Sequence, residues 1–179
     1  SSGALRAAIY AENFPDRVER LILDAHVYTG EGSPTLEKRR DGLDGFRANN
    51  MRAVDKDFFL SIFTRDKPGT SEEGVGEALA ATELELCNQV PTGTYLDMCA
   101  NLPVNDPAKI KCPVQIIRGE YDGIASEEDL IDFYMKLPNM DKQFVIIRGQ
   151  AHVSPLGLNR HRFWHVVEAF LTMPKRLDG

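Results

Sequence analysis

The sequence predicts an α/β fold in which a parallel sheet carries helices on both faces. Three short segments are typical of strands, namely "RVERLILDA", "CPVQIIRGEYD" and "KQFVIIRGQAH", and segments with helical periodicity alternate with them. The apolar residues of these strands cluster instead of alternating with polar ones, which is typical of strands covered on both faces. Strands and helices that alternate along a chain form parallel sheets, whose ligand sites lie beyond the carboxyl ends of the strands.

The composition fits a globular domain and argues against several classes of function. The 179 residues are 42% hydrophobic and carry a net charge of -6, with lysines and arginines scattered among acids. The chain shows no basic stripe for nucleic-acid phosphates, no polybasic run for a membrane surface, and no apolar run near the roughly 20 residues of a membrane span. Cys87, Cys99 and Cys112 lack CxxC spacing, so we expect neither a disulfide framework nor a zinc site. A cytoplasmic location is the default expectation.

The first segment, residues 1–29, contains one helix and one strand. A helix is predicted over Gly3–Asn13 because Leu5, Ala8 and Ile9 share one face, and it must end before Pro15. The strand "RVERLILDA" follows directly. We expect these residues to belong to the sheet domain.

Residues 30–109 break the alternation of strands and helices and are predicted to form a helical insertion. "GEGSP" and "RDKPGTSEEG" are loop-like, and helical patterns lie between and after them. The chain returns to the sheet domain at "NDPAKIKCP", where Asp106 is expected to cap a helix that has Pro107 at its first position. Apolar residues at helical spacing in the insertion include Leu36, Phe46, Phe58, Ile62, Leu79 and Leu86.

Residues 110–179 are assigned to the sheet domain and contain two strands and two helices. The strands are predicted over Val114–Ile117 and Phe144–Ile147. One helix begins after Ser126, which stands with Asp129 in the order of a capping box. The other covers about residues 157–172 and is expected to bury Phe163, Val167, Phe170 and Leu171.

A serine, an aspartate and a histidine are placed as a serine-nucleophile site requires. Asp122 and His152 follow the last two strands, so both side chains are expected at the carboxyl ends of neighbouring parallel strands. A serine hydroxyl is a poor nucleophile until a base removes its proton, and a histidine held by a carboxylate can act as that base. Ser1 is the candidate nucleophile, and Gly3 is the small residue two positions after it.

These residues and turns resemble the C-terminal part of the α/β-hydrolase fold superfamily. "ALRAAIYAENFPDRV" resembles the family's segment from the nucleophile helix to the next strand, "PVQIIRGEYD" its acid strand and turn, and "GQAH" its histidine loop. The chain order Ser, Asp, His is also that of the α/β-hydrolase triad. The resemblance covers roughly residues 1–28 and 110–179, and it implies that Ser1 is the serine of the G-x-S-x-G turn.

The resemblance implies a division of roles among the site residues. Ser1 attacks a carbonyl carbon, and His152 accepts the proton of the serine hydroxyl. Asp122 orients the imidazolium, and the backbone N–H of Ser2 holds the oxyanion. This chemistry needs no metal and no organic cofactor.

The insertion resembles the family's cap, which closes over the serine and sets substrate choice. Phe58, Phe59 and Tyr95 are expected to line an apolar pocket, and His26, just past a strand end, is expected to line it without reacting. The alternative is that the aromatic residues form the cap's own core. The resemblance also implies a companion segment, the N-terminal half of the sheet, either as a separate chain or as part of the same one.

The predicted function is hydrolysis of an ester, lactone or amide bond in a small, partly apolar molecule through an acyl-enzyme. Hydrolysis of a carbon–carbon bond, or acyl transfer to an alcohol, would use the same residues. The alternative from another class is a ligand-binding relative without turnover. Neither nucleic acid nor a membrane is expected as a partner.

Several of these assignments have alternatives. Ser1 lies in a Ser-Ser-Gly stretch that also occurs as a remnant of expression tags, Ser2 could be the nucleophile instead, and the amine of an N-terminal serine can itself act as a base. Asp122 could be only a solvated turn residue, in which case Asp24 is the reserve acid. Glu120 is expected to form a structural contact.

Overall fold

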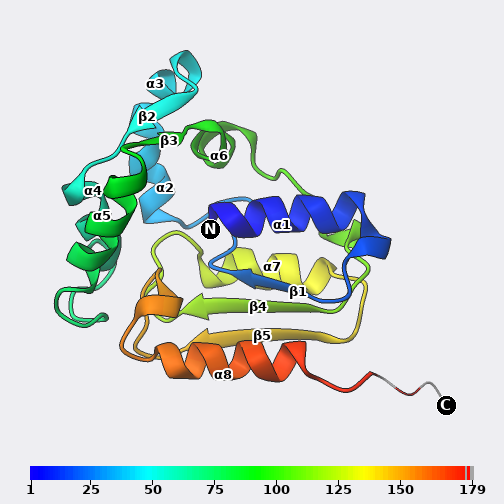
Figure 1. The fold of residues 1–179 in the computed structure, drawn as a ribbon. Coiled ribbons are helices and arrows are strands. Elements are labelled where there is room, and N and C mark those ends of the chain that lie inside the picture. Colours follow the sequence, from blue (N-terminus) through cyan, green and yellow to red (C-terminus); the bar gives the residue numbers. More distant parts are fainter. Residues whose placement is uncertain (176, 178–179) are drawn as a thin grey trace.

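A parallel sheet of three strands forms the centre of the protein, in a computed structural model that describes residues 1–175 and 177. The strands β1 (Leu21–Asp24), β4 (Val114–Gly119) and β5 (Lys142–Ile147) lie in the order β1-β4-β5 (Figure 1). Leu21 pairs with Val114, which pairs in turn with Lys142. The three predicted strands and the parallel α/β fold class are therefore confirmed.

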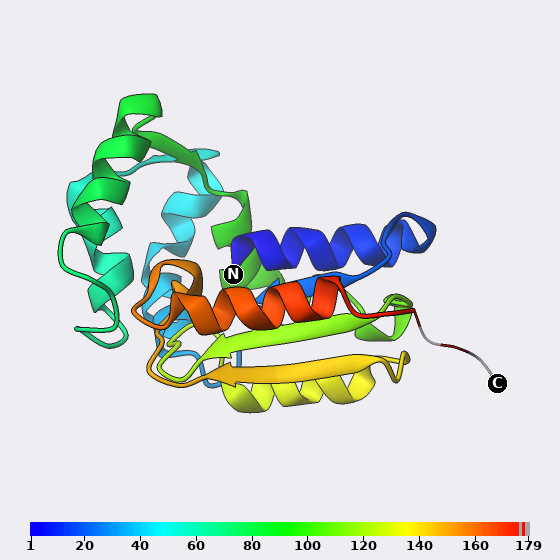
Figure 2. The ribbon, with the colours of Figure 1, turned by 60° about the horizontal axis from the view of Figure 1, so that its bottom comes forward.

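Helices cover both faces of this sheet. The helices α1 (Ser2–Asn13) and α7 (Glu127–Lys136) pack on one face, and α8 (Arg160–Leu171) packs on the other (Figures 1 and 2). In the central strand, Ile116 contacts the α1 and α7 side and Ile117 contacts the α8 side, and both are fully buried. This two-sided burial is the reason that the strand is a continuous apolar run.

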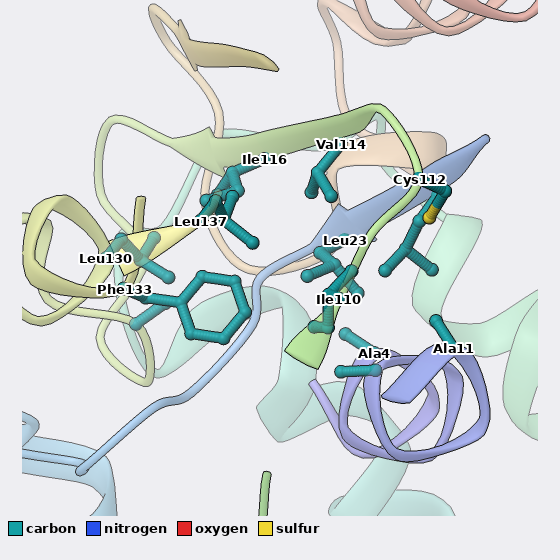
Figure 3. Close-up of a cluster of buried hydrophobic side chains, with 13 residues drawn as sticks. Ala4, Ala11, Leu23, Ile110, Cys112, Val114, Ile116, Leu130, Phe133 and Leu137 are labelled. Atoms are coloured by element: carbon teal, nitrogen blue, oxygen red, sulfur yellow. The ribbon is translucent and has the colours of Figure 1, made fainter. Parts of the chain in front are cut away.

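The larger hydrophobic cluster lies between the sheet, α1 and α7 (Figure 3). Phe133 of α7 is fully buried at its centre, and small residues of α1, among them Ala4 and Ala11, let that helix lie close to the strands. Burying an aromatic side chain of this size contributes about 1.5–3 kcal/mol. The cluster therefore fixes the N-terminal end of α1, where Ser1 lies, relative to the sheet.

The inserted region, residues 30–109, lies at the carboxyl ends of the strands (Figure 1). Its helices are α2 (Pro34–Arg39), α3 (Leu43–Ala48), α4 (Lys56–Thr64), α5 (Val75–Leu86) and α6 (Gly93–Leu96). It also contains an antiparallel pair of strands, β2 (Met51–Ala53) and β3 (Gln89–Pro91), which the sequence did not predict. Each of these strands has three residues, which is too short for an alternating pattern to stand out.

Short helical turns complete the structure. Four are 3-10 turns and one is a π-helical turn, namely Pro15–Arg17, Arg40–Gly42, Pro107–Lys109, Ser154–Leu156 and Asp97–Asn101. The predicted cap is present, because the Asp106 carboxylate accepts a hydrogen bond from the Ala108 N–H at 3.0 Å. None of the helices in the described residues combines the length and the apolar character that crossing a membrane requires.

Two predictions about helix ends need correction. The last helix begins at Arg160, and Leu171, the last residue of that helix, is 54% exposed instead of buried. At α7, Ser126 accepts the Asp129 N–H as expected. The Asp129 carboxylate does not complete a capping box, because it accepts hydrogen bonds from the backbone of Tyr28, Thr29 and Gly30. It thereby ties the segment after β1 to α7.

Candidate active site

Three elements bring Ser1, Asp122 and His152 to one end of the sheet. Ser1 precedes the first residue of α1, Asp122 lies in the turn after β4, and His152 lies in the loop after β5. The carboxyl ends of β4 and β5 and the N-terminal end of α1 meet at this end (Figure 1). The sequence placed the three side chains on the same end, and the structure brings them into contact.

The three side chains form one continuous chain of hydrogen bonds. His152 Nε2 lies 3.1 Å from Ser1 Oγ. His152 Nδ1 lies 3.1 Å from Asp122 Oδ1 and 3.2 Å from Oδ2. In the tautomer with the proton on Nδ1, His152 donates to the carboxylate and its Nε2 lone pair accepts the serine hydroxyl proton.

The Asp122 carboxylate is buried and held ionised. Its Oδ1 accepts hydrogen bonds from the backbone N–H groups of Ile124 at 2.8 Å and Ala125 at 3.2 Å. Burial by itself raises the pKa of Asp122, but attraction to His152 and the hydrogen bonds from His152, Ile124 and Ala125 outweigh it. The pKa of Asp122 therefore lies below its ordinary value, so the carboxylate is charged at neutral pH. A solvated turn residue would not be buried in this way.

His152 is held in its neutral form. Burial lowers the pKa of His152 below its ordinary value, although the Asp122 carboxylate acts in the opposite direction. A neutral imidazole is the state that can accept a proton from a serine hydroxyl. His152 is therefore neutral at neutral pH.

Arg118 holds the turn that carries Asp122, a role that no sequence signal indicated. Its guanidinium donates hydrogen bonds to four backbone carbonyl groups around the turn, those of Gly119, Glu120, Asp122 and Ala125. All four acceptors are main-chain atoms, which leave no trace in the sequence. The turn is thus fixed by a single planar cation with several donors.

The acid turn and the histidine loop are in direct contact. The Glu120 carboxylate accepts the Gly149 N–H at 2.7 Å, which confirms the structural contact expected of Glu120. Gly119 is required at the end of β4, because a Cβ there would overlap with the carbonyl oxygens of Ala151 and Gln150. These contacts set the separation between Asp122 and His152.

Ser2 lies beside Ser1 at the start of α1. It is the first helical residue, and it lines the cavity in front of Ser1. The N–H groups in the first turn of a helix have no partner within the helix, and the helix dipole is positive there. The Ser2 N–H is one of these first-turn groups.

A cavity of about 340 Å³ opens in front of Ser1 and His152. Two of the expected substrate-contact residues, Phe58 and Tyr95, line it. The other two do not. Phe59 packs into the inserted region's own core with Val54 and Ala80.

His26 is fully buried and is not among the described residues that line the cavity. Its ring packs edge-on against Phe133, with 4.6 Å between the ring centroids. Burial lowers the pKa of His26 to about 3, so the ring is neutral. The ring therefore packs against a residue of the main hydrophobic cluster and not against the cavity lining.

Asp24, the reserve acid, does not replace Asp122. Burial raises its pKa to about 7, and its Oδ1 finds no hydrogen-bond partner among the described residues. The Asp24 carbonyl oxygen accepts a hydrogen bond from the Ser1 nitrogen at 3.1 Å. The nitrogen of Ser1 is thus engaged with Asp24, whereas the Ser1 hydroxyl is engaged with His152.

Asp66, from the inserted region, is a second buried carboxylate at the site. Its ligand atoms and those of Asp122 and His152 lie within 4.8 Å of one another, a grouping of residue types that can bind a metal. His152 Nδ1 and Asp122 are already joined by a hydrogen bond, so these two metal-ligating groups are engaged with each other. Asp66 Oδ1 lies 3.6 Å from the Arg65 side chain. No sequence signal pointed to Asp66, because it stands in a loop-like stretch.

The sequence also missed a group of cations. Four arginines, Arg6, Arg39, Arg52 and Arg65, line the cavity in front of Ser1. They come from α1, the end of α2, β2 and the residue after α4. These arginines are so far apart in the sequence that only the fold brings them together.

Comparisons with known proteins find similarity in structure alone. No protein-family model matches the sequence, and no curated protein matches it. The monoacylglycerol lipase of Paleococcus ferrophilus superposes with a TM-score of 0.64 at 16% identity, over 96% of this chain and 66% of that one. The enol-lactonase of Burkholderia xenovorans LB400 gives 0.61 at 21% identity, over 96% and 63%.

A third structure has the same fold. A soluble variant of the Saccharomyces cerevisiae monoglyceride lipase, in complex with a substrate analog, gives a TM-score of 0.66 at 16% identity, over 96% of this chain and 62% of that one. The chain thus spans 66%, 63% and 62% of the lengths of these three structures, which is less than two thirds in each case. From the sheet order, the helices on both faces and these superpositions, the fold of this chain is that of the α/β-hydrolases.

Proposed function

We propose that this chain carries the catalytic residues of a serine hydrolase that cleaves an ester, lactone or amide bond in a small molecule. One observation carries the proposal, namely the hydrogen-bond chain from Ser1 through His152 to Asp122. Structures with the same fold are named as lipases, an esterase and a lactonase, which supports carboxylic ester or lactone chemistry.

The mechanism follows from the hydrogen-bond chain. Ser1 Oγ attacks the substrate carbonyl carbon while His152 Nε2 takes the hydroxyl proton, which forms a tetrahedral intermediate. Asp122 stabilises the imidazolium, and His152 then donates the proton to the leaving alcohol or amine. A water molecule then attacks the acyl-enzyme with His152 as the base, and His152 returns the proton to Ser1 Oγ as the acid is released. The Ser2 N–H holds the oxyanion in both steps, a contribution of about 3 kcal/mol for one such donor.

A companion segment is part of this proposal. β1 forms an edge of the three-stranded sheet, and an unpaired edge in a buried parallel sheet is unfavourable. Polar atoms of Asp24 and His26, at the end of β1, are buried and have no partner among the described residues. We infer that further strands pair with β1 and supply these partners, and that the active form contains them.

The test is covalent labelling of the complete protein with a fluorophosphonate. We expect one adduct on Ser1, located by mass spectrometry of peptides, and turnover of a short-chain 4-nitrophenyl ester. Ser1→Ala should abolish both, and Ser2→Ala, which leaves the hydroxyl of Ser1 in place, should retain the label. Absence of labelling in a folded protein that still binds small esters would favour the ligand-binding alternative.

A further inference from the structure

The cavity in front of Ser1 is cationic, in a chain whose net charge is -6. Four arginines line it, and no aspartate or glutamate occurs among the described residues that do so. Like charges brought together in a partly enclosed cavity repel one another and raise the local positive potential. An anion that enters the cavity relieves this repulsion.

Arg39 and Arg52 have no carboxylate partner in the part of the chain that the structure describes. Among the described residues, Arg39 Nη1 donates only to the sulfur of Met98, at 3.2 Å, and thioether sulfur is a weak acceptor. Arg52 Nε is buried and finds no acceptor in the described part of the chain. Burial, reinforced by the nearby cations of Arg65 and Arg52, lowers the pKa of Arg39 below its ordinary value. Half-buried cations without partners are unfavourable unless a ligand pairs with them.

Tyr95 holds both of these guanidinium groups. The guanidinium carbons of Arg39 and Arg52 lie 3.8 Å and 4.0 Å from the centroid of its ring. Arg52 also lies 4.6 Å from the centroid of Phe58. Contacts of this kind orient a guanidinium through its face and leave its N–H groups free to bind a planar or tetrahedral anion.

The other two arginines are less suited to bind a ligand. Arg65 lies 3.6 Å from the buried carboxylate of Asp66, so part of its charge is compensated. Arg6 is exposed to solvent on α1. Arg39 and Arg52 are therefore the two half-buried arginines of the cavity that lack a carboxylate partner among the described residues.

We propose, on the basis of the hydrolase function proposed above, that the substrate carries a carboxylate or phosphate group, which Arg39 and Arg52 bind while its scissile carbonyl lies at Ser1. The remaining lining is largely apolar and includes Ile62, Val90 and Ile124. A short hydrocarbon segment between the scissile carbonyl and the anionic group fits this lining. The substrate class is thus a small half-ester, or a lactone or amide with a free acid group.

The test compares two esters that differ in one charge. The complete protein is assayed with the 4-nitrophenyl monoester of glutaric acid and with the same ester after its free carboxylate is methylated. We expect the anionic ester to have the higher kcat/KM, by about tenfold or more. The reason is that the free energy of one charge-assisted hydrogen bond corresponds to a factor of this size. The kcat/KM of an ester with a terminal phosphate in place of the carboxylate shows which of the two anions the site prefers.

Substitutions assign the preference to the two arginines. Arg39→Gln and Arg52→Gln are each expected to lower the ratio of the two kcat/KM values by about tenfold. Arg52→Lys should restore part of the ratio, because the charge remains and the planar fork is lost. Arg47→Gln is the matched control, since Arg47 belongs to the same inserted region, is exposed and pairs with Asp44 outside the cavity. It should leave the ratio unchanged.

The outcomes separate this inference from the hydrolase function itself. Hydrolysis of the methylated ester at an equal or higher kcat/KM, or a ratio that survives both glutamine substitutions, overturns the inference and leaves the hydrolase function intact. If Ser1 takes no label and neither ester is hydrolysed, the hydrolase function fails, and titration calorimetry with glutarate and with inorganic phosphate decides the anion site. Saturable binding that Arg39→Gln weakens about tenfold supports the site, and absence of binding of both anions overturns it.

Discussion

The sheet domain and the inserted region contribute to the site in different ways. Asp122 and His152 follow adjacent strands joined by backbone hydrogen bonds, and their loops are tied together at Gly119 and Glu120. Arg39 and the other inserted-region residues of the cavity come from short helices and from a pair of three-residue strands. The sheet thus holds the three side chains of the proposed triad in fixed geometry, and the inserted region supplies most of the cavity lining that would meet the rest of the proposed substrate.

The largest expected difference lies between two buried carboxylates near His152, one from each region. Asp122→Asn should lower kcat/KM by about 10⁴-fold, because an asparagine amide favours the wrong tautomer of His152. Asp66→Asn should lower it by less than about tenfold, because Asp66 has no hydrogen bond to His152 among the described contacts. The measurement is steady-state kinetics of the complete protein with one neutral ester. Equal losses in the two variants would contradict the assignment of the acid.

Stability should also differ between the regions. Phe133→Ala, in the centre of the sheet domain's core, should lower the free energy of unfolding by about 3–5 kcal/mol, because it leaves a cavity in close-packed surroundings. Phe46→Ala, where the ring is half-buried against Tyr95, should lower it by about 1 kcal/mol. Denaturant unfolding of the complete protein measures both. A larger effect at Phe46 would mean that the inserted region carries the main core.

Two glycines should respond to alanine in opposite directions. Gly119→Ala places a methyl group on the backbone of the histidine loop and should destabilise the protein by about 1–3 kcal/mol, with a loss of activity. Gly45→Ala, on the exposed side of α3 with no atom near the added methyl group, should stabilise it by about 0.5 kcal/mol. Thermal unfolding with parallel activity assays tests this pair. Full activity in folded Gly119→Ala would show that the close approach is not required.

The smallest effect concerns pH. Burial lowers the pKa of His152, so the neutral base persists to lower pH than for a solvated histidine. The kcat/KM of the complete protein should therefore rise with pH through a midpoint below the ordinary histidine value of about 6.5 and be level above it. A pH profile with a neutral ester, whose charge does not change, measures this midpoint. A midpoint above about 7 would show that the charged form of His152 is favoured instead.

The elements that the sequence predicted best share a physical property. β4 is the buried central strand of the sheet and α7 packs against the sheet, and the apolar patterns of both follow from that burial. The elements it missed, β2 and β3, are short and half-exposed, so packing against neighbours decides them. The same contrast holds in the site. Asp122 and His152 were predictable because they follow strands, whereas the cavity lining was only half right, with Phe58 and Tyr95 present and Phe59 and His26 elsewhere.

By itself, the sequence determined the parallel sheet, the helices on its faces, and the end of the sheet where the serine, aspartate and histidine stand. These follow from local periodicity and from the rule that parallel strands present their carboxyl ends at one edge. Only the tertiary structure decided that Arg118 braces the acid turn, that Asp66 reaches the site, and that Arg39 and Arg52 meet around Tyr95. The reason is that their partners are backbone carbonyl groups or side chains far away in the chain, and such contacts arise only when separate elements pack together.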